Sequence, residues 1–298
     1  MRKLLFSLFI IVAFSAMNQM ANAQVDVTPS LATYANLKAA FAAVNAGTHG
    51  ATPTVTITSS YAEPDSAVLT GANITSCLIT TSGTNTVTGN ANSPIIILND
   101  ADNVTIDGRV GQTGTTRSLT ITNGNTGTNN SIICWRNGAS NNTVRYINAQ
   151  GSTTLATVGR LMQIAQTVAG GTGGNNNNVI EYNSIDRGAR GIQVFGTANG
   201  TNSFTNDNTT IRGNIVKNTN ALGIFIGSFV NGVNCTENIL TYDAASTMAA
   251  SWVGIQVQAV GTVNITKNVV RDLASAVGLS SALRGSIALP VTLAGTNL

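Results

Sequence analysis

Residues 178–196 read NVIEYNSIDRGARGIQVFG, and residues 209–227 repeat the pattern as TTIRGNIVKNTNALGIFIG. The pattern returns in residues 233–258 and again in residues 263–289. A fixed period in the range of 20 to 50 residues indicates stacked repeats, in which each unit buries its apolar side only against its neighbours. The glycines that open the second half of each copy are spaced by 32, 31 and 31 residues: Gly191, Gly223, Gly254 and Gly285.

The alternation of side chains within each copy predicts strands. Ile192 and Val194 flank Gln193, which is the period of two that a strand with one buried face shows. No copy has the sustained 3.6-residue period of helical repeats. An apolar column comes from the first half of each copy: Ile180, Ile211, Cys235 and Ile265. The residues that follow form an outward column: Glu181, Arg212, Thr236 and Thr266.

Strands that stack on their own copy one period later run parallel. We therefore predict an all-β, right-handed parallel β-helix with about 31 residues per coil. Less regular strands are expected before the clear repeats, at residues 54–58, 73–79, 95–98, 102–109, 132–135, 142–148 and 161–164.

A second aligned position holds asparagine, with spacings of 31, 24 and 30 residues: Asn183, Asn214, Asn238 and Asn268. Asparagine tolerates the left-handed backbone of a tight bend, and its amide can bond to the same residue one coil away. These positions predict an amide ladder at one corner, although asparagine also suits ordinary turns without a ladder. Longer inserts are expected at three places: Thr197 to Asn208, Asp243 to Ser251 and Asp272 to Leu283.

The N-terminus is typical of export. Residues 1–23 combine Arg2 and Lys3, an apolar run and a small-residue site for cleavage near Ala23, which predicts a signal peptide. Without these residues, 13 basic side chains face 12 acidic ones, and no basic run favours nucleic acid. No membrane span is expected after the signal peptide is removed.

Residues 24–52 are predicted to close the end of the solenoid. Thr33 to Asn45 has helical apolar spacing, with Thr33 as its expected cap and Gly47 at its end. Such a helix would cover strand edges that otherwise pair with other chains. The β-helix would then occupy residues 53–298, and it stops part-way through a coil, which predicts a fragment of a longer protein.

Few residues suggest catalysis, and we predict no catalytic, metal or cofactor site. His49, the single histidine, lies after the predicted helix without a nucleophile motif. Three cysteines lack metal-ligand spacing: Cys77, Cys134 and Cys235. Aspartates near residues 100–107 lack calcium-site spacing. Acidic residues near one corner stand beside Lys217 and Arg271, which indicates charges that pair across coils: Asp186, Asp243 and Asp272.

The strongest binding candidate is an outward row with one residue per coil: Gln163, Gln193, Phe225 and Gln256. Amides and one aromatic ring at this spacing could contact sugar hydroxyls and a sugar face. The alternative is a glutamine ladder that only stiffens the sheet. Trp252, beside one insert, joins this candidate face.

The copies resemble the parallel β-helix repeat family, best in NVIEYNSI and GIQV within residues 178–194. The resemblance covers residues 90 to 298 and includes both pectate-lyase-like polysaccharide enzymes and non-enzymatic bacterial surface proteins. YANLKAAFAAVNAGTHG (residues 34–50) and DNVTIDGR (residues 102–109) look more like the second group. The resemblance implies a structural or adhesive surface module, and the outward row would give it a weak contact with extracellular polysaccharides or surface glycans. The alternative is a polysaccharide lyase or glycoside hydrolase with acids assembled from different coils.

Overall fold

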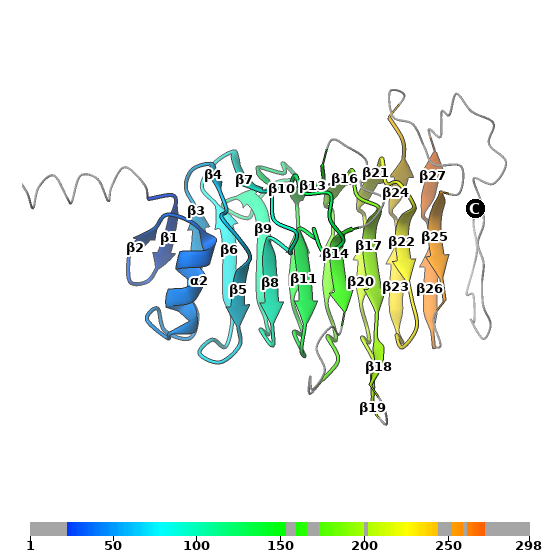
Figure 1. Cartoon of the computed structure of the whole chain (residues 1–298), viewed down its shortest axis with the longest axis horizontal. Coiled ribbons are helices and arrows are strands. Elements are labelled where there is room, and N and C mark those ends of the chain that lie inside the picture. Colours follow the sequence, from blue (N-terminus) through cyan, green and yellow to red (C-terminus); the bar gives the residue numbers. More distant parts are fainter. Residues whose placement is uncertain are drawn as a thin grey trace, which may run out of the picture.

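The computed structural model describes residues 23–152, 159–165, 173–199, 202–243, 252–258 and 261–271. Within these ranges the chain is nearly all strand and winds as a parallel β-helix (Figure 1). Each coil contributes one strand to each of three sheets, here called A, B and C. The predicted fold class is confirmed.

The three sheets are ordered from coil to coil. Sheet A contains, in spatial order, β2 (Ala32–Tyr34), β1 (Val25–Thr28), β3 (Thr54–Ile57), β6 (Cys77–Thr81), β9 (Val104–Val110), β12 (Thr143–Arg145), β15 (Val179–Glu181), β20 (Thr210–Arg212), β23 (Val233–Thr236) and β26 (Val263–Thr266). Sheet B contains β4 (Tyr61–Ala62), β7 (Asn85–Gly89), β10 (Leu119–Asn123), β13 (Ile147–Gln150), β16 (Ser184–Asp186), β21 (Ile215–Lys217), β24 (Ile239–Thr241) and β27 (Val269–Arg271). Sheet C contains β5 (Ala67–Thr70), β8 (Ile96–Asn99), β11 (Ile133–Arg136), β14 (Arg160–Ala165), β17 (Arg190–Phe195), β22 (Leu222–Ile226) and β25 (Val253–Val257).

The core is a set of apolar columns that run along the axis. In sheet C, Ile192 pairs with Ile224, and Ile224 pairs with Ile255, in parallel strands. Gly285 and Ile287, the fourth copies, lie outside the described residues. The predicted column in sheet A is also in register, with its last member partly buried: Ile180, Ile211, Cys235 and Ile265.

The stacked glycines of sheet C allow close packing at one corner. A Cβ atom on Gly191 would lie 2.4 Å from Cγ1 of Val216 and 2.7 Å from the carbonyl oxygen of Gly223. A Cβ atom on Gly223 would lie 2.4 Å from Cδ2 of Leu240 and 2.6 Å from the carbonyl oxygen of Gly254. No side chain fits at such distances, which is why glycine recurs with the period of the coil.

The aligned asparagines form the predicted ladder between sheets A and B. Oδ1 of Asn214 accepts from the backbone N–H of Asn183 at 3.0 Å and from its Nδ2 at 3.1 Å. The contact recurs from Asn214 to Asn238 and from Asn238 to Asn268.

The predicted reason for asparagine at this bend is wrong in one respect. The left-handed backbone belongs to the residue before each ladder asparagine: Tyr182, Gly213, Glu237 and Lys267. Each ladder asparagine instead occupies its place because its amide reaches the coils on both sides, as Asn183 bonds to Val144 and to Asn214.

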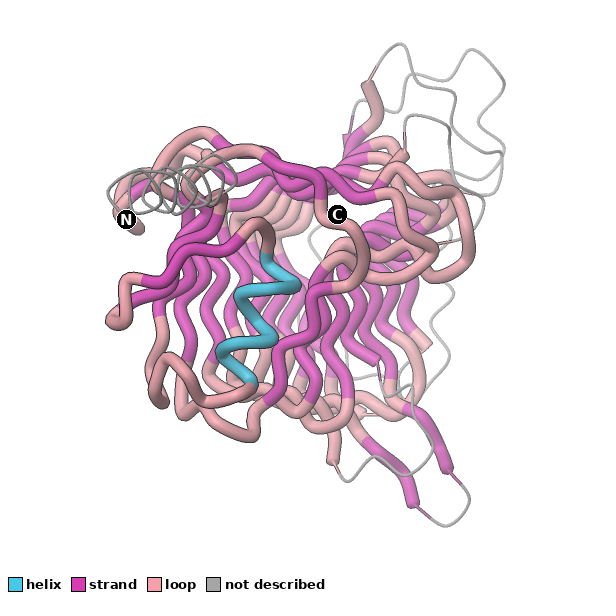
Figure 2. Tube along the Cα trace, turned by 60° about the vertical axis from the view of Figure 1, so that its left-hand side comes forward, coloured by secondary structure: helices cyan, strands magenta, loops and turns pink. Residues whose placement is uncertain are grey.

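A cap closes the N-terminal end of the coils (Figure 2). The helix α2 spans Leu37–Asn45, and its N-cap is Asn36, whose Oδ1 accepts from the Ala39 N–H at 2.9 Å. The predicted start at Thr33 is wrong, because Thr33 belongs to β2 and pairs with Asp26 of β1. The strand β1 also pairs antiparallel with β3, so it covers the first edge of sheet A, which the sequence patterns did not predict.

Two of the early strand predictions need correction. The strand predicted at residues 73–79 begins only at Cys77, and residues 142–148 form two strands, β12 and β13, separated by the bend at Tyr146. The insert predicted at Thr197 to Asn208 contains a hairpin of β18 (Thr197–Asn199) and β19 (Asn202–Phe204), which projects beside the coils (Figure 1). The other two inserts lie largely outside the described residues.

Candidate functional site

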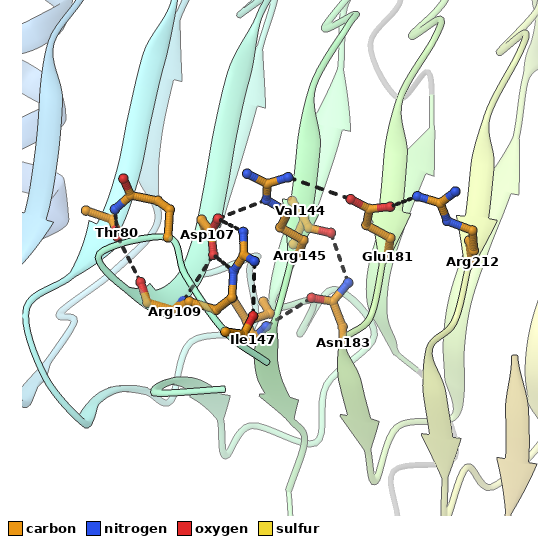
Figure 3. Close-up of polar contacts among 11 residues, drawn as sticks. Thr80, Asp107, Arg109, Val144, Arg145, Ile147, Glu181, Asn183 and Arg212 are labelled. Atoms are coloured by element: carbon orange, nitrogen blue, oxygen red, sulfur yellow. Dashed lines mark hydrogen bonds and ion pairs between the residues drawn. The ribbon is translucent and has the colours of Figure 1, made fainter. Parts of the chain in front are cut away.

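The outer face of sheet A carries a row of alternating charges. Asp107, Arg145, Glu181 and Arg212 occupy one register position on four successive strands (Figure 3). Nε of Arg145 lies 2.9 Å from Oδ2 of Asp107, and Nη2 of Arg212 lies 2.5 Å from Oε2 of Glu181. The two carboxylates are therefore each held by arginines of neighbouring coils.

Asp107 is the most tightly held of these acids. Its side chain is fully buried, and Arg109 adds bonds from Nη2 to Oδ2 at 2.6 Å and from Nε to Oδ1 at 2.9 Å. Burial acts to raise the pKa of Asp107, but the hydrogen bonds from Arg109 and Arg145 outweigh it and hold the pKa below its ordinary value. Such a carboxylate stays ionised and is unsuited to serve as a general acid near neutral pH.

Two tyrosines stack beside this row. The rings of Tyr146 and Tyr182 lie 5.2 Å apart and nearly parallel, and the Arg109 guanidinium lies 4.2 Å from the centre of the Tyr146 ring. The Arg212 guanidinium lies 5.4 Å from the centre of the Tyr182 ring. Tyr182 has a left-handed backbone before Asn183, and Tyr146 has the same conformation before Ile147 one coil earlier, so neighbouring coils place the rings one above the other.

A second charged cluster lies at the corner after sheet B. Nζ of Lys217 lies 3.3 Å from Oδ2 of Asp243 and 3.8 Å from Oδ2 of Asp186. Nδ2 of Asn218 donates to carboxylate oxygens of both aspartates. The predicted pairing of opposite charges across coils is confirmed here, and Lys267 pairs with Glu237 in the same way at 3.8 Å. Asp272, the third predicted acid, lies outside the described residues.

The predicted binding row lies in register on the outer side of sheet C. Gln163 pairs with Gln193, Gln193 with Phe225, and Phe225 with Gln256. Gln163 and Gln193 are only 8% and 2% exposed, whereas Phe225 and Gln256 are partly exposed. The row is therefore accessible mainly at its two later members.

The oxygens of the buried amides already have partners. Oε1 of Gln163 accepts from Oγ of Ser131 at 3.3 Å. Oε1 of Gln193 accepts from Nε of Arg160 at 3.0 Å and from Nη1 of Arg190 at 2.6 Å. The sequence patterns missed these two arginines, although their positions one coil apart, three residues before each glutamine, were a detectable signal.

Trp252 does not belong to an exposed face. It is 1% exposed, packs in the core cluster and donates from Nε1 to Oγ1 of Thr219 at 2.8 Å. Its ring contacts Tyr242 edge to face at 5.6 Å. The prediction that Trp252 joins the binding face is wrong, because this side chain fills the interior.

The remaining chemical groups lie apart from both rows. His49 is buried in the cap, where its ring nitrogens contact Oγ of Ser30 and, at 2.7 Å, the hydroxyl of Tyr34. The three cysteines are buried and unpaired, and Cys235 fills the interior as predicted. Across the described ranges, no three His, Cys, Asp or Glu side chains gather as metal ligands. No helix within these ranges is long and apolar enough to cross a membrane.

The chain matches no known family profile, no curated protein and no solved structure.

Proposed function

We propose that the chain is an exported β-helix module that acts as a structural or adhesive part of a cell-surface or extracellular protein. The export rests on the signal predicted in residues 1–23. The structural role is supported by one observation above all: the outward carboxylates Asp107 and Glu181 are bonded to arginines of adjacent coils. These acids therefore contribute to the contact between coils, because their carboxylate oxygens are bonded to arginine side chains of the protein itself.

Glycans are the partner that the outer face of sheet C fits best. Phe225 and Gln256 are neighbours on successive coils and both are partly exposed. An aromatic ring contacts the apolar face of a sugar, and an amide can donate to and accept from its hydroxyl groups. This contact surface is small, so the expected binding to a single chain is weak and gains strength where several modules bind together.

Retention on polysaccharides, measured together with product formation, tests the proposal. The protein from Gln24 onward should be retained on some members of a panel of immobilised polysaccharides, with no new reducing ends or unsaturated products. The variant F225A/Q256A should be retained less, whereas T236A/T266A, on the outer face of sheet A, should behave as the unchanged protein. Product formation would replace this proposal with a lyase or hydrolase, and lack of retention on every polysaccharide would remove the adhesive role.

A further inference from the structure

Sheet C differs from the other two sheets in the sign of its charges. Its described strands contain three arginines and neither aspartate nor glutamate: Arg136, Arg160 and Arg190. Sheet A and sheet B both contain acidic residues within their strands. The strands of sheet C therefore carry only positive charges, on a chain whose acids and bases are almost equal in number once residues 1–23 are set aside.

Two of these arginines lie side by side. Arg160 of β14 and Arg190 of β17 are direct partners in the parallel ladder, and adjacent strands lie about 4.8 Å apart. Both donate to the same neutral oxygen, Oε1 of Gln193. One amide oxygen positions both guanidinium groups but does not neutralise them.

Neither arginine has an acidic partner in the part of the chain that the structure describes. Every ion pair found there involves other cations, such as Arg109, Arg145 and Arg212 on sheet A. Burial lowers the pKa of Arg190, and the charge of Arg160 lowers it further. The two guanidinium charges, held side by side on adjacent strands, repel each other. A bound anion would offset this repulsion and would also attract both arginines.

The donors needed to bind an anion are present. A guanidinium carries five N–H groups, and the contacts with Gln193 use one nitrogen of each arginine. Both arginines are partly exposed. The Arg190 guanidinium also lies 4.9 Å from the centre of the Phe225 ring, which restricts its motion beside the partly exposed ring.

We infer that Arg160 and Arg190 form a site for an oxyanion group, carboxylate or sulfate, carried by a glycan that also contacts Phe225. Paired guanidinium groups suit both oxyanions because they donate several parallel hydrogen bonds to adjacent oxygens. This inference rests on the glycan contact proposed above and specifies its chemistry. A glycan with acidic groups would then lie along the coil axis, with its charge over β14 and β17 and a sugar face over β22.

Binding to three soluble glycans of matched length tests this inference: a neutral glucan, a polyuronate and a sulfated glucan. The unchanged protein should bind at least one acidic glycan about tenfold more tightly than the neutral one, because charge-assisted hydrogen bonds are stronger than neutral ones. The variant R160Q/R190Q should lose this preference but keep its affinity for the neutral glycan. The uronate and sulfate arms show which oxyanion the site prefers.

Lys267→Gln is the matched control, because it removes one positive charge from an exposed residue of another part of the surface. Circular dichroism and thermal unfolding of each variant would show that the coils are retained. If the unchanged protein binds all three glycans equally, or K267Q weakens acidic binding as much as R160Q/R190Q does, the oxyanion site is wrong while the glycan contact remains. If it binds no glycan, the inference and the proposed adhesive function both fail.

Discussion

Single asparagine side chains join successive coils at the corner between sheets A and B. Asn214 is fully buried, donates to the carbonyl oxygen of Ile180 at 2.8 Å and bonds to Asn183 and Asn238 on either side. A buried amide whose hydrogen bonds are all made stabilises the fold. Removal of one asparagine from the ladder leaves its partners in the coils on both sides without those hydrogen bonds.

Asn214→Ala should therefore lower the free energy of unfolding by about 2 to 4 kcal/mol, since several buried groups lose their partners. Urea unfolding followed by circular dichroism would measure this change. Asn234→Ala is the control, because Asn234 is exposed on sheet A and its replacement should cost little. Equal costs for the two substitutions would show that the ladder does not join the coils.

Asp107 should make stability depend on acid pH. Its pKa in the folded protein lies below its value of 3.8 in the unfolded chain, so the ion pairs stabilise fully above about pH 4. This contribution is lost as the pH falls through the folded pKa. Asp107→Asn should cost about 3 kcal/mol at pH 7 and clearly less at pH 2, measured by urea unfolding at both values.

Glu237→Gln serves as the comparison for Asp107→Asn. Glu237 and Lys267 pair at 3.8 Å with both side chains well exposed, so this substitution should change stability by less than about 1 kcal/mol at either pH. A cost for Asp107→Asn that did not change with pH would contradict the assignment of Asp107 as a buried ion-paired carboxylate.

Among the elements, the Gly-Ile strands of sheet C depend on close approach between coils. The glycine columns meet the side chains of Val216 and Leu240 from sheet B at distances that leave no room for a methyl group. Core overpacking of this kind forces backbone or side-chain shifts in a stack that repeats at every coil.

Gly223→Ala should lower stability by about 1 to 3 kcal/mol, because its Cβ would overlap Leu240 and the carbonyl oxygen of Gly254. Thermal unfolding gives the measurement. Gly83→Ala is a suitable control, since no atom lies within 4 Å of its Cβ position and its φ angle is not positive. Little or no loss of stability in Gly223→Ala would mean that the strands of sheet C can separate without cost.

The N-terminal cap should loosen in weak acid. Burial lowers the pKa of His49 below 6.5, so protonation is easier in the unfolded chain and cap stability falls as the pH drops below about 6.5. Amide hydrogen exchange in α2 and β1 should therefore speed up between pH 7.5 and pH 5.5, after correction for the intrinsic rates. His49→Gln should remove this dependence, and an unchanged dependence would exclude His49 as its source.

Across the whole molecule, each coil is held only by its neighbours, so openings should begin at the ends of the stack. The three buried cysteines report on this, because Cys77, Cys134 and Cys235 lie on early, middle and late strands: β6, β11 and β23. Burial raises the pKa of Cys77 to about 12, of Cys134 to about 11 and of Cys235 to about 12, so none should react while folded.

Thiol labelling in increasing urea should modify the core residues Cys77 and Cys235 only when their own coils open. Cys134 lies on the outer side of sheet C in register with Gln163, so it should react earlier, once the side chains that cover it move. Mass spectrometry of the labelled peptides would give the order. Simultaneous labelling of all three cysteines would show instead that the stack unfolds as one unit.

The sequence alone determined the coil, its period and the residues of its columns. This was possible because a stacked repeat buries each side chain against its own copy in the next coil. The alternation of apolar residues and the spacing of the copies therefore predict that Ile192 packs on Ile224 and that Asn214 belongs to a ladder. The cap was predicted only in part, because a short strand such as β1 has no second copy to align with.

Only the tertiary structure decided which outward residues are accessible. The sequence patterns placed both Gln193 and Trp252 on the outward face. In the structure Gln193 is covered by other side chains, and Trp252 fills the interior. The spacing of Arg160 and Arg190 by one coil is visible in the sequence, but only the structure shows that both donate to the same oxygen of Gln193. Accessibility and charge balance are set by side chains from other segments, and a one-dimensional repeat does not specify where those side chains lie.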